Sequence, residues 1–206
     1  MKRSMAIIMF VVLAGLTTAA AKPKFTSTWK TPNAPSVSYA GKKVVGVVVT
    51  NDLSLQMSAE EALVRALNER GVQGVAAYRL IPREELKDPA RAKGWVDRSG
   101  AAGVVILRLI DLTREKIPTS VVWSGASYYG SLWTYYPYAW GSTFEIVPSR
   151  TDVRVIVESL VFDVVSNKLL WAGTSEASNP KGAQELVQAI VEEAAAQMKK
   201  DGLIKK

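Results

Sequence analysis

The chain has 206 residues, of which 48% are hydrophobic and 22% are charged, and its formal net charge is +7 at pH 7. This length and apolar content are typical of one globular domain with its own core. The chain contains no histidine and no cysteine, which excludes Ser-His-Asp and Cys-His catalysis, metal sites built on those residues, and disulfide bonds. The positive charge is typical of a solvated basic surface. An anionic membrane or the cell-wall polymer would also suit it, and nucleic acid suits it least because the charges are spread out.

The first 21 residues have the features of a secretory signal peptide. Lys2 and Arg3 form a charged start, an apolar run follows from Met5 to Leu16, and three alanines end at Ala21. The run is too short to span a bilayer, and small residues favour cleavage after Ala21, although an uncleaved anchor is the alternative. We therefore expect a secreted, periplasmic protein. Because no cysteine is present, we expect no lipid anchor.

Residues 22–41 are predicted to be an extended lead-in with an edge strand near 25–29, and residues 42–206 a single α/β domain. The apolar run 42–50 predicts a central strand. The predicted fold class is α/β (α+β), a single-layer mixed sheet with helices packed on it, in the order β-α-β-α-β-loop-β-β-α. The remaining expected elements are a helix at 58–70 with a Ser58–Glu61 capping box, a strand at 75–80, a helix from Asp88 to about Arg98, a strand at 103–112, a hairpin of 151–163 and 168–174, and a last helix capped by Asn179.

Two charge patterns bear on catalysis. Adjacent carboxylates such as Glu60 and Glu61 point in different directions on a helix, so we expect solvated helix faces there. Arg108 and Asp111 are predicted to mark where the strand 103–112 leaves the core. No glycine-rich phosphate loop follows the first strand. The sequence therefore predicts a protein that is not an enzyme and has no cofactor or metal.

Residues 117–150 form an aromatic excursion rich in glycine and serine, in which we recognise no strand or helix period. Tyrosine and tryptophan combine a large contact area with a polar tip, which suits interfaces. The alternatives are rings that pack on the domain itself, contact a protein partner, contact a membrane, or stack on a glycan. The candidate partner-binding residues are Trp123, Tyr128, Tyr129, Trp133, Tyr135, Tyr136, Tyr138 and Trp140.

Several short motifs resemble a family of small bacterial envelope lipoproteins of unknown function. They are Thr28-Trp29-Lys30-Thr31-Pro32, matching a T-W-K-x-P start, and Ser166-Asn167-Lys168-Leu169-Leu170-Trp171 in the closing hairpin. The element order is also similar to that of periplasmic α/β domains such as the curli channel subunit, the amino-terminal domain of TolB and the activators of penicillin-binding proteins. The resemblance implies a non-enzymatic envelope role and supplies no catalytic residue.

Together these features predict a secreted, non-catalytic, envelope-associated binding or accessory protein that acts through the aromatic loop. An envelope protein is the expected partner. The alternative is a membrane-surface or glycan-binding module that uses the same rings.

Overall fold

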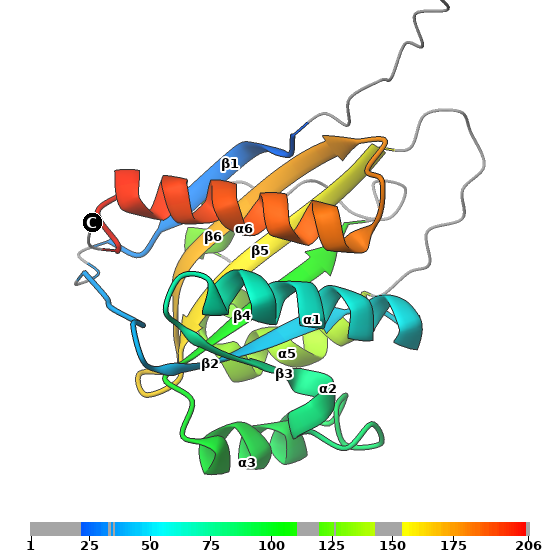
Figure 1. The fold of residues 1–206 in the computed structure, drawn as a ribbon. Helices are drawn as coiled ribbons and strands as arrows, with labels where there is room; N and C mark the ends of the chain where they lie inside the picture. The colour runs from blue at the N-terminus through cyan, green and yellow to red at the C-terminus, as the bar shows by residue number, and fades with distance from the viewer. Residues whose placement is uncertain are drawn as a thin grey trace, which may run out of the picture.

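The computed structural model describes residues 22–204 except 33, 35, 111–119, 126 and 143–153 (Figure 1). The predicted signal peptide, residues 1–21, lies outside the described residues. So do both ends of the aromatic excursion, residues 117–119 and 143–150. No helix in the described part of the chain is long and apolar enough to cross a bilayer.

The described strands form one mixed sheet of six strands in the order β1-β6-β5-β4-β2-β3. The pairs β2–β3 and β2–β4 are parallel, and the other three pairs are antiparallel. The predicted α/β class is confirmed, and so is the edge strand near residue 25. The strands are β1 (Lys24–Lys30), β2 (Lys43–Val49), β3 (Gln73–Ala76), β4 (Gly103–Leu109), β5 (Arg154–Asp163) and β6 (Lys168–Ser178).

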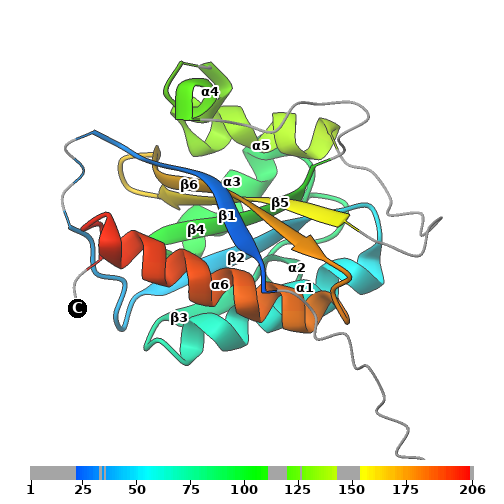
Figure 2. The ribbon, with the colours of Figure 1, turned by 90° about the horizontal axis from the view of Figure 1, so that it is seen from above.

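Helices cover both faces of the sheet, so that α1 and α6 lie on one side and α4 and α5 on the other (Figure 2). The buried residues of α2, α3 and α5 share one core cluster, and those of α1 and α6 share another. The helices are α1 (Leu53–Asn68), α2 (Ala77–Leu80), α3 (Pro89–Ser99), α4 (Ser120–Gly125), the 3₁₀ helix η1 (Ser127–Gly130), α5 (Leu132–Gly141) and α6 (Ala183–Lys200).

The sequence of strand β2 is apolar throughout because both faces of this strand are covered. Val45 and Val47 pack in the cluster that contains α5, whereas Val48 packs against α1 and α6. A strand covered on both faces has no solvent side, so its residues do not alternate between apolar and polar. The same argument predicted this strand from its sequence, and that prediction is confirmed.

Two predicted helix and turn signals are also confirmed. The Asp88 side chain accepts hydrogen bonds from the first turn of α3, and Gly100 ends this helix with a φ of 70°. Asn167, in the turn between β5 and β6, has a φ of 55°, a left-handed conformation that asparagine tolerates well.

Several predicted element boundaries are wrong, among them the end of the hairpin, where β6 runs to Ser178 and not to residue 174. Helix α1 begins at Leu53 and is capped by Asp52, whose side chain accepts from the Leu55 N–H; the sequence assigned this role to Ser58. Strand β3 ends at Ala76, and residues 77–80, predicted as part of this strand, form the helix α2. Helix α6 begins at Ala183 with no side-chain cap, because its first turn starts four residues after the predicted Asn179 cap.

Candidate functional site

The aromatic excursion is helical where the structure describes it. Its residues form α4, η1 and α5, and the Ser131 side chain caps α5 by accepting from the Thr134 N–H at 3.2 Å. The absence of a helix period predicted from the sequence is therefore wrong. The buried residues of α5 recur at the spacing of one helix face; they are Leu132, Tyr135, Tyr136, Ala139 and Trp140.

Most of the candidate partner-binding rings belong to the core. Their burial makes them part of the layer that covers the sheet, and only three of the eight retain partial exposure. This matches the alternative in which the rings pack on the domain itself, and whether the remaining rings bind a partner stays a prediction. The buried rings are Trp123, Tyr129, Tyr135, Tyr136 and Trp140, and the half-buried rings are Tyr128, Trp133 and Tyr138.

A buried ion pair lies beneath this layer. Arg108 on β4 and Glu158 on β5 are cross-strand partners, and the Arg108 Nε lies 3.0 Å from the Glu158 Oε2. Both side chains are at most 1% exposed. The prediction that Arg108 marks the end of the buried strand is therefore wrong. Arg108 remains in the core because the carboxylate directly across the strand pair neutralises it.

Glu158 connects the aromatic helices to the sheet. Its carboxylate accepts hydrogen bonds from the Trp123 Nε1 at 3.2 Å, from the Tyr135 hydroxyl at 2.6 Å and from the Tyr129 hydroxyl. These donors come from α4, α5 and η1, so each of the three helical segments is tied to the same residue of β5. A buried charge is stable only when such donors compensate its lost hydration.

The hydroxyl groups of Tyr129 and Tyr135 remain hydrogen-bond donors at any physiological pH. Burial first, and the negative charge of Glu158 second, raise the pKa of Tyr129 and of Tyr135 well above the ordinary value. A protonated phenol donates to a carboxylate, whereas a phenolate would repel it. The network therefore ties the three helical segments to β5 through protonated phenols.

The rings also contact each other and nearby cations. Tyr128 stacks on Tyr138 with ring centroids 4.2 Å apart, and the Arg108 guanidinium lies 5.1 Å from the Tyr138 centroid. Lys93 on α3 lies 6.0 Å from the centre of the Trp133 ring. The Tyr136 hydroxyl donates to the Leu86 carbonyl at 2.6 Å. These contacts join α5 to the segment that carries α3.

A second buried carboxylate corrects another prediction. Glu60 on α1 is 0% exposed, so the solvated face predicted there holds for Glu61 only, which is paired with Arg79. Glu60 accepts from the Val48 N–H at 3.0 Å, from the Tyr78 N–H at 2.8 Å and from the Gln56 Nε2 at 3.0 Å.

The position of Glu60 explains its burial. Strand β3 pairs with β2 only as far as Gly46. Val48 therefore lies past the end of the β2–β3 ladder, and its N–H needs another acceptor on that side of β2. Glu60 supplies that acceptor. Its carboxylate also accepts hydrogen bonds from the first backbone N–H groups of α2. Burial raises the pKa of Glu60 to about 7, although these hydrogen bonds act in the opposite direction. Its contacts are therefore those of a structural residue.

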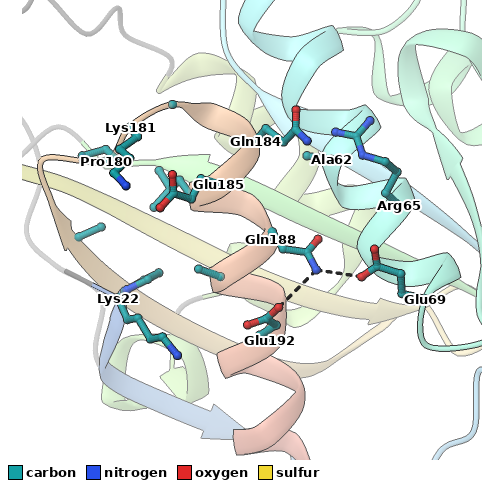
Figure 3. Close-up of a pocket in the computed structure, with 15 residues that line it drawn as sticks. Lys22, Ala62, Arg65, Glu69, Pro180, Lys181, Gln184, Glu185, Gln188 and Glu192 are labelled. Carbon is teal, nitrogen blue, oxygen red and sulfur yellow. Dashed lines mark hydrogen bonds between the residues drawn. The ribbon is translucent and has the colours of Figure 1, made fainter. Parts of the chain in front are cut away.

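Two surface cavities lie beside α6. The larger, about 700 Å³, runs over the start of α6 and reaches α1 (Figure 3). There Gln188 donates to Glu69 at 2.9 Å and to Glu192 at 3.3 Å. The smaller, about 210 Å³, lies between α1 and α6 and has an almost wholly aliphatic lining. In the described ranges, no group of three or more acidic residues is arranged to hold a metal ion.

Comparisons with known proteins identify no family for this chain. No protein-family model matches the chain, and no curated protein matches it. Similar solved structures include a dodecamer of a PelC variant and a PelC dodecamer, both from Paraburkholderia phytofirmans, with TM-scores of 0.46 and 0.44. Each is 14% identical, and the match covers 81% of this chain and 93% of that chain.

A third similar structure is the lipoprotein GNA1162 from Neisseria meningitidis, with a TM-score of 0.39 and 14% identity. That match covers 77% of this chain and 99% of the lipoprotein. Likeness at this level bears on neither the site nor the function.

Proposed function

We propose that this protein is a secreted, non-catalytic, envelope-associated binding or accessory protein that contacts its partner through the outer side of α5. The signal-like residues 1–21 and the motifs shared with small envelope lipoproteins support the location. The observation that carries the proposal is that the eight aromatic rings differ in their exposure to solvent. Five are core, and Tyr128, Trp133 and Tyr138 remain partly exposed above them.

A rigid support favours binding through these three rings. Tyr128 and Tyr138 form a stacked pair over the Arg108–Glu158 anchor, and Trp133 packs against the buried Tyr136 at 5.5 Å. Rings held in place by packing lose little conformational freedom when a partner binds. The same rigidity argues against a catalytic use of Glu158, because its oxygens already accept four hydrogen-bond donors within the core.

Co-sedimentation of residues 22–206 with envelope fragments stripped of peripheral protein tests this function. The most informative pair of variants is Pro137→Lys and Pro137→Ala. Pro137 is exposed and lies inside α5, so either change restores a backbone N–H and preserves the helix. Only the lysine places a charge between Trp133 and Tyr138.

We expect the wild type and Pro137→Ala to pellet with the envelopes, and Pro137→Lys to remain in the supernatant. Ser58→Lys, an exposed change on α1 across the sheet, is the control for added charge and should pellet like the wild type. Equal pelleting of Pro137→Lys and Pro137→Ala would contradict a role for α5.

A further inference from the structure

The smaller of the two cavities beside α6, called the aliphatic cavity below, lies on the side of the sheet opposite to α5. It measures about 210 Å³ and is enclosed by the first halves of α1 and α6 and by strands β2, β4 and β5. Leu109, Ala183 and Leu186 pack in the core cluster of this layer, and they remain partly exposed where they border the cavity. Protein interiors are normally packed without voids of this size, so the aliphatic cavity requires an explanation.

Water is a poor occupant of the aliphatic cavity. An ordered water needs about two to four polar partners, whereas the lining is almost wholly aliphatic. Arg108, which also borders the cavity, directs its guanidinium to Glu158 and the Tyr138 ring on the other face of the sheet. Apolar cavities stay dry and take up apolar molecules.

The size and lining of the cavity favour a single aliphatic chain. At about 30 Å³ for each water-sized group, a volume of about 210 Å³ accommodates roughly seven methylene groups,. No aromatic ring is present among the described residues that line the cavity, so a flat ring would find no stacking partner there.

The aliphatic cavity continues into the larger cavity, which is called the charged groove below. Both are lined by Pro180, Gly182 and Leu186 at the start of α6. A ligand that fills both sites therefore needs an apolar chain at one end and a polar head group at the other. The charged surface around the opening is unlike the apolar centre of a protein interface.

The charges of the groove favour an anionic head group. Two of the three acidic residues that line it, Glu69 and Glu192, accept hydrogen bonds from Gln188. The three basic residues that line it have no acidic partner in the described part of the chain; they are Lys22, Arg65 and Lys181 (Figure 3). The unpaired cations thus outnumber the one remaining carboxylate.

We infer that the aliphatic cavity and the charged groove together bind a fatty acid, with its chain between α1 and α6 and its carboxylate beside the unpaired cations. Recognition is assigned to burial of the chain, with a smaller contribution from the charge of the head group. This site lies in the layer opposite to α5, so the inference goes beyond the proposed function and does not depend on it.

The dependence of binding on chain length tests the inference. Titration calorimetry on residues 22–206 measures the affinity for unbranched fatty acids of four, six, eight, ten and twelve carbons, for the eight-carbon alcohol and for the eight-carbon trimethylammonium salt. We expect the affinity to rise about fourfold for each added methylene and to level off near eight carbons, when the cavity is full. The acid should bind more tightly than the alcohol, and the alcohol more tightly than the ammonium salt.

Ala183→Leu places a larger aliphatic side chain in the cavity. We expect this variant to bind the eight-carbon acid about tenfold more weakly than the wild type, and to unfold at a higher temperature without ligand. Ser58→Leu adds the same side chain at an exposed position of α1 and should bind like the wild type.

The double variant Arg65→Gln with Lys181→Gln tests the head group separately. Both residues are exposed, so this variant should fold normally and remains decisive where Ala183→Leu fails to fold. We expect it to bind the acid several-fold more weakly and to bind the alcohol unchanged.

Three outcomes would overturn the inference. One is an affinity that does not depend on chain length, and another is equal binding of the acid and the alcohol by the wild type. The third is no binding of any probe together with a lower unfolding temperature of Ala183→Leu, which would mean that another segment of this chain fills the cavity. Co-sedimentation of the Pro137 variants is independent of all three.

Discussion

Glu158 concentrates the interactions that hold the aromatic helices on the sheet. One carboxylate pairs with Arg108 and accepts from Trp123, Tyr129 and Tyr135. Removing one member of a buried charge pair leaves the other charge without compensation. We therefore expect Glu158→Gln to lower the free energy of unfolding by about 3 kcal/mol or more in urea titrations.

The matched control is the more exposed ion pair between Arg154 on β5 and Glu176 on β6. Glu176 on β6 lies 2.5 Å from Arg154, where solvent screens the charges, so Glu176→Gln should cost far less than Glu158→Gln. Equal losses in the two variants would mean that the buried network has no special role.

Because Glu60 is buried, we expect the free energy of unfolding to depend on pH with a definite sign. Burial raises its pKa in the folded protein to about 7, from an ordinary value of 4.5. Protonation is then easier in the folded than in the unfolded state. The resulting stabilisation is fully present below pH 4.5 and is lost as the pH rises through about 7,.

The free energy of unfolding of the wild type should therefore fall between pH 5 and pH 8 relative to that of Glu60→Gln. Urea titrations of both proteins across this range provide the measurement. Parallel curves would show that Glu60 does not titrate there.

Among the elements, helix α1 begins earlier in the structure than its sequence predicts. Ser58 and Glu61 have the spacing of a capping box, but the helix begins earlier, with Asp52 as its cap. Asp52→Ala should lower the free energy of unfolding by about 1 kcal/mol. Ser58→Ala should leave it unchanged or raise it slightly, because Ser58 is an exposed position inside the helix,. Thermal unfolding of the two variants checks this, and the reverse ranking would restore the predicted boundary.

The helical character of residues 132–141 was readable in principle. Leu132, Tyr135, Tyr136, Ala139 and Trp140 follow the period of a helix face. Glycine and serine before them and Pro137 within them favoured a loop instead. The aromatic content indicates the right segment, and the spacing of these five residues is the sequence signal for the buried face of α5.

Other features of the site had no local signal. Arg108 and Glu158 are fifty positions apart, and they meet because β4 and β5 pair in one particular antiparallel register. Glu60 is buried because β3 is short, a tertiary fact that the sequence of α1 does not contain. Strand β2, by contrast, was predictable because its apolar run reflects burial on both faces,.

In the whole molecule, the aromatic helices belong to one of the two layers that enclose the sheet (Figure 2). Their inner rings complete the core that includes Val47, Ile106 and Phe162, and their outer surface carries the half-buried rings Tyr128, Trp133 and Tyr138. The core role explains the number of rings, and the binding role that we propose accounts for the few that remain exposed.

The aromatic segment is a packed layer of the fold, and we propose that its outer side binds a partner. Hydrogen exchange of the backbone amides in α5, measured on residues 22–206, tests whether this helix belongs to the packed layer. We predict that the amides of residues 136–140 that can exchange are protected as strongly as those of α1, and that Glu158→Gln reduces their protection first. Exchange of these amides at the rate of an open chain, with α1 and the sheet still protected, would show that α5 is not part of the packed fold.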